Sequence, residues 1–82
     1  MRIDKFINAV NLTKRRAVAQ DMIKHDAVKL NGIVAKASKQ VKIGDVIEFV
    51  YLESTETYEV LQIPTTKSIP KSKTDEYVKA LS

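Results

Sequence analysis

Three consecutive cations, Lys14, Arg15 and Arg16, stand at the predicted start of a helix that follows Thr13. The first turn of a helix carries unpaired backbone N–H groups and the positive end of the macrodipole, so folding alone favours acidic residues there. Cations at this place create a site where a phosphate receives hydrogen bonds from both amides and guanidinium groups. The planar guanidinium of an arginine is better suited to this than a lysine. The run predicts an anion site, with a merely solvated helix end as the alternative.

Arg2 and Lys5 extend this predicted site from an earlier helix. A tight connection between the two predicted helices would bring both side chains toward the cations of the second helix. For Arg2, an ion pair with Asp4 or Asp26 is an equally good role. We therefore expect Arg2 and Lys5 to contact the same polyanion and keep the ion pair as the alternative for Arg2.

The distribution of charge supports a polyanionic partner. The chain has 82 residues and a formal net charge of +4. Residues 1–39 hold nine Lys and Arg against three acids, a net +6, while residues 40–82 hold five against seven, a net −2. Because neutralisation of phosphates by Lys and Arg dominates nucleic-acid affinity, the basic first half predicts nucleic-acid binding.

Residue types that do catalysis are scarce. There is no cysteine, and the single histidine, His25, lies at the predicted end of the second helix, where it can cap terminal carbonyls. No metal cluster, Cys–His pair or phosphate-binding glycine loop can be assembled from such a sequence. A chain this short forms one small domain with little room for a deep pocket. We expect no enzyme, no catalytic residue, no metal and no cofactor.

The same inventory bears on location. Without cysteine there is no disulfide, and the longest apolar run, 49–52, is too short to cross a bilayer. An acidic residue at position 4 and the lack of an apolar segment near the N-terminus argue against a secretory signal. The sequence predicts a cytoplasmic protein with no membrane partner.

Two short helices must position the cations. Asp4 is the predicted N-cap of a helix that runs to about Val10, with Phe6 on its apolar face. Thr13 is the predicted N-cap of the second helix, which runs to about His25. Neither helix is long enough to be stable alone, so both must pack against something else.

That partner is predicted to be a small antiparallel sheet. Asn31-Gly32, between apolar segments 28–30 and 33–35, is a strong signal for a type I′ hairpin. Lys36 and Lys39 lie in the loop that follows, where phosphate contact and simple solubility are both open. A turn at 43–45 leads to a strand over 46–52, and a turn at 53–56 to a strand over 57–63.

The elements indicate an α+β fold in which a helical hairpin packs on this sheet. We assign residues 1–63 to the RNA-binding domain with its β-extension. Residues 64–82 form a linker and a short C-terminal segment, helical over about 75–81. The predicted RNA-binding residues are Arg2, Lys5, Lys14, Arg15, Arg16, Lys36 and Lys39.

Five segments, in order along the chain, carry a resemblance to a known family. They are RIDKFI at 2–7, TKRRAVA at 13–19, VKLNG at 28–32, VAKAS at 34–38 and VKIGD at 41–45. Together they resemble the stand-alone RNA-binding domain first described in small-subunit ribosomal protein S4. Within that family the chain is most similar to the RqcP group of small bacterial ribosome-quality-control factors, and more distantly to the fifteen-kilodalton heat-shock protein.

The resemblance implies an αL-type RNA-binding fold whose basic face binds structured RNA. It implies a non-catalytic factor, monomeric when free, that binds the rRNA of obstructed large ribosomal subunits and their P-site peptidyl-tRNA. It also implies that the factor acts beside the protein RqcH and supports alanine tailing of stalled nascent chains. On this resemblance Arg2, Lys5, Arg15 and Arg16 match the positions that contact rRNA and the tRNA backbone.

The chain departs from the RqcP pattern at two positions. Such proteins commonly carry a basic residue where this chain has Asn11 and an aliphatic residue where it has Thr13. The predicted N-cap explains Thr13, whereas Asn11 removes one phosphate contact. Three alternatives remain: a heat-shock ribosome-recycling factor of the same fold, an RNA-targeting module for a separate RNA-modifying enzyme, and a module that binds proteins through a sheet edge or the acidic second half.

Overall fold

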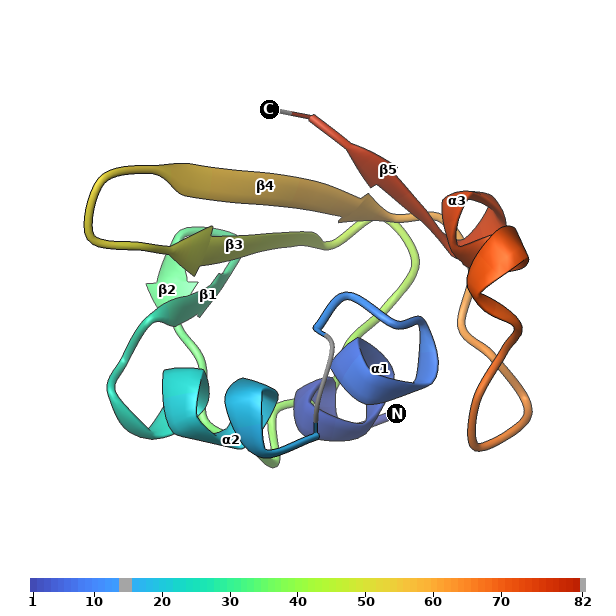
Figure 1. The fold of residues 1–82 in the computed structure, drawn as a ribbon, viewed down its shortest axis with the longest axis horizontal. Coiled ribbons are helices and arrows are strands. Elements are labelled where there is room, and N and C mark those ends of the chain that lie inside the picture. The colour runs from blue at the N-terminus through green and yellow to red at the C-terminus, as the bar shows by residue number, and fades with distance from the viewer. Residues whose placement is uncertain (14–15, 82) are drawn as a thin grey trace.

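Two helices cover one face of a five-stranded antiparallel sheet (Figure 1). The computed structural model describes residues 1–13 and 16–81, and for Arg16 the backbone alone. The order of strands across the sheet is β2-β1-β3-β4-β5, and every neighbouring pair is antiparallel. The α+β class and the helical hairpin on a small sheet are therefore confirmed, and no helix of the described residues is long and apolar enough to span a bilayer.

The first helix, α1, spans Ile3–Ala9 and buries its apolar face completely. The predicted N-cap was wrong: Arg2 occupies that position and makes no side-chain cap, while Asp4 lies in the first turn. There the Asp4 carboxylate accepts the backbone N–H of Lys5 at 2.8 Å. A carboxylate in the first turn complements the positive end of the helix, which is why the sequence pattern resembled a cap.

Both helices end in the same way without glycine. After α1, Asn11 has φ 63°, and its N–H and that of Leu12 bond to carbonyls of Asn8 and Ile7. After α2, which spans Arg16–Lys24, Asp26 has φ 59°. Its N–H and that of the next residue bond to carbonyls in the last turn of α2, as at the end of α1. These are Schellman motifs with Asn or Asp in the left-handed position that glycine usually holds.

The second helix agrees with its prediction where it can be compared. Its expected start after Thr13 includes Lys14 and Arg15, which lie outside the described residues. At the other end, His25 follows the helix, and its Nδ1 donates to the carbonyl of Asp21 at 2.8 Å, as expected for a capping histidine.

The hairpin at Asn31-Gly32 joins β1, Val28–Leu30, to β2, Ile33–Val34. Both turn residues have positive φ, 53° and 84°, which confirms the predicted type I′ geometry. The Asn31 side chain also donates to Asp45 at 3.1 Å and accepts the N–H of Val46 at 2.9 Å. The turn is thereby fixed to the beginning of the next strand.

The first long strand begins where predicted but ends two residues early, and the second begins two residues and ends three residues earlier than predicted. β3 spans Val46–Val50 and β4 spans Thr55–Val60, so the reversal falls at 51–54 and not at 53–56. Alternation in β3 buries Ile47 and Phe49 beneath the helices. The polar residues of 53–56 had suggested the turn, but two of them pair with the end of β3 instead.

The C-terminal segment contains more structure than a helical turn. A 3-10 turn, η1 (Lys71–Lys73), leads into α3 (Thr74–Tyr77), and β5 (Val78–Ala80) then pairs with β4. The predicted helix over 75–81 is therefore correct only for its first residues. Val78 is buried in the core, and this apolar anchor explains why the end of the chain joins the sheet.

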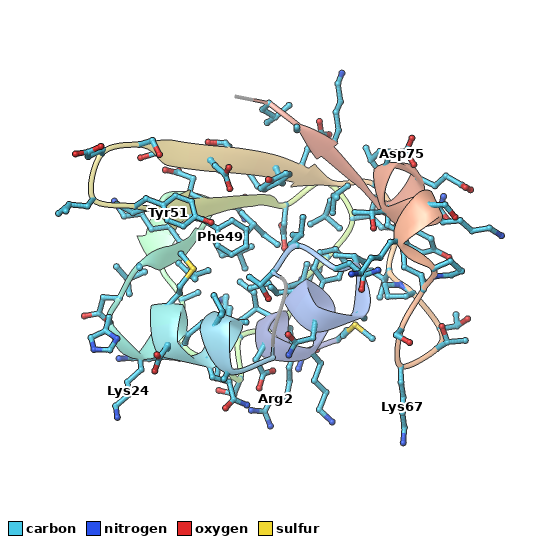
Figure 2. The ribbon with its side chains drawn as sticks, viewed as in Figure 1. Arg2, Lys24, Phe49, Tyr51, Lys67 and Asp75 are labelled. Carbon is cyan, nitrogen blue, oxygen red and sulfur yellow. The ribbon has the colours of Figure 1, made fainter. Side chains whose placement is uncertain are left out.

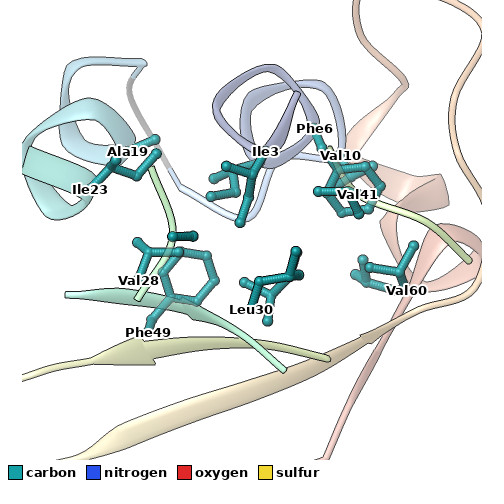
Figure 3. Packing of buried hydrophobic residues seen from close by; sticks show 14 residues of the cluster. Ile3, Phe6, Val10, Ala19, Ile23, Val28, Leu30, Val41, Phe49 and Val60 are labelled. Carbon is teal, nitrogen blue, oxygen red and sulfur yellow. The ribbon is translucent and has the colours of Figure 1, made fainter. Parts of the chain in front are cut away.

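One core lies between the helices and the sheet (Figure 3). Ala19 and Ile23 of α2 lie above Val28 and Phe49, while α1 lies over the other end of the sheet. Phe6 is fully buried, which confirms its predicted packing role and excludes base stacking by this ring. The cluster comprises Ile3, Phe6, Ile7, Val10, Ala19, Ile23, Val28, Leu30, Ala35, Val41, Ile47, Phe49, Val60 and Val78.

Candidate nucleic-acid interface

The loop between β2 and β3 returns to the beginning of α1. Ile3 donates its backbone N–H to the carbonyl of Lys39 at 2.7 Å, and Arg2 and Gln40 form a β-bridge. Val41 donates to the carbonyl of Met1 at 2.9 Å. The bond from Ile3 satisfies one of the N–H groups that a helix start leaves unpaired, and the others join the loop to the residues before the helix.

This loop brings two separated parts of the sequence together. Arg2 directly precedes α1 and Lys5 lies on it, whereas Lys36 and Lys39 lie on the loop bonded to its beginning, and all four residues are exposed. Nothing in local sequence patterns indicates this return, because it depends on backbone bonds between residues far apart in the chain. Four of the seven predicted residues thus lie on neighbouring segments.

Arg2 forms the ion pair that was its alternative role. Its Nη2 lies 3.1 Å from Asp4 Oδ2, with the arginine side chain 46% exposed and the aspartate side chain 11%. A guanidinium has five N–H donors in a fixed plane, so one bond to Asp4 leaves others free for a phosphate. The ion pair and a phosphate contact are therefore compatible, and Asp4 orients the guanidinium.

The remaining predicted residues lie around α2. Arg16 is its first residue, so its backbone lies in the first turn, as predicted. Lys14 and Arg15 precede it and lie outside the described residues. Helices α1 and α2 pack against each other, which places the beginning of α2 on the same layer as Arg2 and Lys5.

Two further cations face the same side and were not predicted. Lys24 at the end of α2, Arg2, and Lys67 in the loop before η1 all project away from the sheet (Figure 2). Nothing in the sequence around Lys24 indicates RNA binding beyond its place on a helix. Lys67 stands in a polar stretch between Pro64 and Pro70 that resembles a linker, and only the fold brings it beside α1.

The charge division in the sequence corresponds to a division in space. The acidic residues of the second half lie mostly on β3 and β4, in the sheet layer opposite α1 and α2, and on α3 beside the edge of the sheet. Asp75, for example, lies on the far side from Arg2 (Figure 2). The helix layer therefore carries the positive face of the molecule, which we call the basic face: Arg2, Lys5, Lys24, Lys36 and Lys39.

Two open grooves border this face. One, of about 590 Å³, lies between β2 and the following loop, and Lys36, Ser38 and Lys39 are among its lining residues. Another, of about 450 Å³, lies between α1 and the loop that carries Lys67. Within the described ranges, no group of three or more His, Cys, Asp or Glu side chains is arranged to hold a metal ion.

Comparison with known proteins agrees with this geometry. Residues 1–47 match the S4 domain family. The chain is 54% identical over 78 residues to an RQC P-site tRNA stabilizing factor of Helicobacter pylori strain J99, covering 95% of this chain and 93% of that protein. It is 35% identical over 66 residues to the protein of the same name in Bacillus subtilis, covering 80% and 77%.

Solved structures share the whole fold. The solution structure of a hypothetical protein, HP1423, is 50% identical with a TM-score of 0.85, covering 100% of this chain and 98% of that one. A trimeric structure of Vibrio cholerae Heat Shock Protein 15 has the same TM-score at 26% identity, covering 100% and 82%. The likeness extends through the C-terminal segment, beyond the residues that match the S4 domain.

Proposed function

Because this chain belongs to the family of RQC P-site tRNA stabilizing factors, small proteins built on an S4 domain, we propose that it is a non-catalytic RNA-binding factor of ribosome-associated quality control. It binds rRNA and the P-site peptidyl-tRNA on obstructed large ribosomal subunits in the cytoplasm. By holding the tRNA between elongation cycles beside RqcH, it supports alanine tailing of the stalled chain.

The observation that carries the proposal is the basic face. Arg2 at the N-cap of α1 and Lys5 in its first turn are joined by backbone bonds to the loop with Lys36 and Lys39, so a single RNA backbone can reach all four. Contacts to phosphates position a protein on RNA without reading its sequence. Such contacts suit a factor that must hold one tRNA after another.

Binding by this face requires little rearrangement. The backbone of the helices and loop is fixed by the core and by the bonds to Ile3 and Val41, so long side chains alone must order on binding. Release of counterions from the RNA supplies the driving force. Arg16, the first residue of α2, and Lys14 and Arg15, which precede it in the sequence, add further phosphate contacts.

The test is co-sedimentation of the full chain with purified large subunits that retain peptidyl-tRNA. Large subunits without tRNA and small subunits are the matched controls. We expect binding at low salt that is strongest when the P-site tRNA is present and that weakens as salt rises. Absence of co-sedimentation with the tRNA-bearing subunits at low salt would refute the proposal.

The likeness to Heat Shock Protein 15 supplies a second candidate, a recycling factor of the same fold that acts without alanine tailing. Both candidates bind large subunits, so sedimentation does not separate them. Deletion of the gene in a strain that expresses a stalling reporter does: loss of alanine tails supports the tailing factor, and unchanged tails support the recycling factor.

A further inference from the structure

The groove between α1 and the loop 64–68 has the chemistry of a phosphate site. It is lined by Met1, Lys5, Asn8, Thr65, Thr66 and Lys67, with a volume of about 450 Å³. Lysine ammonium groups, amides and hydroxyls all donate hydrogen bonds to phosphate oxygens. None of the described residues that line it is acidic.

The loop is held against α1 by specific bonds. Asn11 Nδ2 donates to the carbonyl of Ile69 at 2.9 Å, and the N–H of Ile69 donates to the carbonyl of Ala9 at 3.0 Å. Pro64 is buried and Ile69 packs against the core, so both ends of the loop are anchored. Lys67 is thereby kept on the side of α1, 62 positions away from Lys5 in the sequence.

Several donors in the groove are not used within the fold. In the part of the chain that the structure describes, Lys5 and Lys67 form no ion pair, and the side chains of Asn8 and Thr65 make no hydrogen bond. The Thr66 hydroxyl is used by Ser68, whose carbonyl accepts from it at 2.8 Å. Two cations that share one groove repel each other, so an anion between them removes an unfavourable interaction.

We propose that this groove binds a backbone phosphate of the same RNA that the basic face binds, with Lys5 and Lys67 as its cationic ligands and Asn8 and Thr65 as neutral donors. The inference rests on the proposed function and deepens it. The C-terminal loop becomes part of the RNA-binding surface, which then runs from Lys24 past Arg2 to Lys67 along one side of the molecule (Figure 2).

The contact is a phosphate contact and reads no base, because the ligands are flexible cations and small donors at the surface. Its expected signature is therefore electrostatic. Removing one phosphate contact flattens the dependence of log affinity on log salt by about 0.7–0.9. An acidic peptide of a protein partner is the competing occupant, and it would leave RNA binding unchanged when Lys67 is removed.

The experiment compares Lys67→Ala with Lys79→Ala in the full chain. Both remove one exposed lysine, but Lys79 lies on β5, away from the groove. Affinity for large subunits is measured over a salt series, and circular dichroism checks that both variants fold. We expect the slope to flatten by about 0.7–0.9 for Lys67→Ala and to stay at the wild-type value for Lys79→Ala.

Four outcomes identify the RNA and separate the two proposals. A flattened slope of Lys67→Ala with tRNA-free subunits assigns the phosphate to rRNA. A flattened slope seen only when P-site tRNA is present assigns the phosphate to the tRNA. Either result supports the proposed phosphate site in the groove. If the wild type binds and Lys67→Ala has the same slope as Lys79→Ala, the groove is not a phosphate site, while the proposed function stands. If the wild type itself does not bind, both proposals are wrong.

Discussion

At the scale of single residues, Arg2 connects folding with binding. It precedes α1, bonds to Asp4 and lies beside the loop that carries Lys39. Because the Arg2 side chain is 46% exposed, its ion pair with Asp4 contributes at most about 1 kcal/mol to stability. The larger role expected of Arg2 is therefore in RNA binding, with Asp4 as the residue that orients it.

Replacement of Arg2 tests this division. We expect Arg2→Ala to lower the free energy of unfolding by no more than about 1 kcal/mol. The slope of log affinity against log salt should flatten by about 0.7–0.9, because one phosphate contact is lost. Arg2→Lys keeps the charge and should keep the slope. An unchanged slope in Arg2→Ala would show that this side chain does not contact phosphate.

Asn31 is a residue whose role is confined to folding. Its φ of 53° suits Asn or Gly, and its amide bonds to Asp45 and Val46. We expect Asn31→Val to lower the free energy of unfolding by about 2–3 kcal/mol, because a β-branched residue at positive φ is strained. Asn31→Gly tolerates the positive φ, so it should lower the free energy of unfolding by only about 1 kcal/mol, because the side-chain hydrogen bonds are lost.

Urea unfolding of the two variants distinguishes strain from hydrogen bonding. Equal losses for Asn31→Val and Asn31→Gly would contradict the argument, since the backbone conformation would then carry no cost. Binding to large subunits should be unchanged for folded protein in both variants, because Asn31 lies outside the basic face.

At the scale of elements, the attachment of the C-terminal loop to α1 is the feature with consequences for function. Asn11 holds positive φ at the end of α1 and bonds to the carbonyl of Ile69. By its departure from the RqcP pattern, Asn11 is predicted to remove one phosphate contact. The structure gives it a different use, since it positions the loop that carries Lys67.

Asn11→Gly tests the attachment without backbone strain, because glycine tolerates φ 63°. Loss of the amide bond should cost about 1 kcal/mol and reduce hydrogen-exchange protection of the Ile69 amide. In a double-mutant cycle, Asn11→Gly and Lys67→Ala should weaken RNA binding by less than the sum of their separate effects. Unchanged protection of Ile69, or strict additivity, would show that Asn11 does not position the loop.

The elements also show what sequence patterns can and cannot predict. Asn31-Gly32 determines its turn locally, and the apolar spacing of α1 determines which face is buried, so both were predicted correctly. β5 could not be predicted, because three residues after a breaker-rich stretch acquire their strand conformation from pairing with β4. The same holds for the site, where Lys39 and Lys67 reach α1 through backbone bonds that no local pattern encodes.

At the scale of the whole molecule, the two layers carry different charge and different chemistry. The helix layer is basic, and the β3–β4 layer holds Tyr51 and Tyr58 near Glu56. Burial, and to a lesser extent Glu56, raises the pKa of both tyrosines above the ordinary value of 10.0. These shifts belong to the stability of the sheet and not to RNA binding.

The raised pKa values predict a loss of stability at alkaline pH. Below about pH 10 the folded and unfolded chains both keep the phenol protons. Above it the unfolded chain releases them first and binds fewer protons, so the free energy of unfolding falls as pH rises. Urea unfolding over a pH series measures this loss for the wild type and for a variant with both Tyr51→Phe and Tyr58→Phe. The free energy of unfolding of the variant should fall less as pH rises, and an equal fall in both proteins would contradict the prediction.

We expect the helix layer, and not positive charge in general, to bind the ribosomal complex. The most direct measurement compares two variants that each lose two cations. For each variant, the affinity for large subunits that bear P-site tRNA is measured. One is Arg2→Ala with Lys5→Ala on the basic face, and the other is Lys73→Ala with Lys79→Ala on η1 and β5. We expect at least about a tenfold loss of affinity for the first variant and nearly wild-type affinity for the second. Equal losses in the two variants would contradict it.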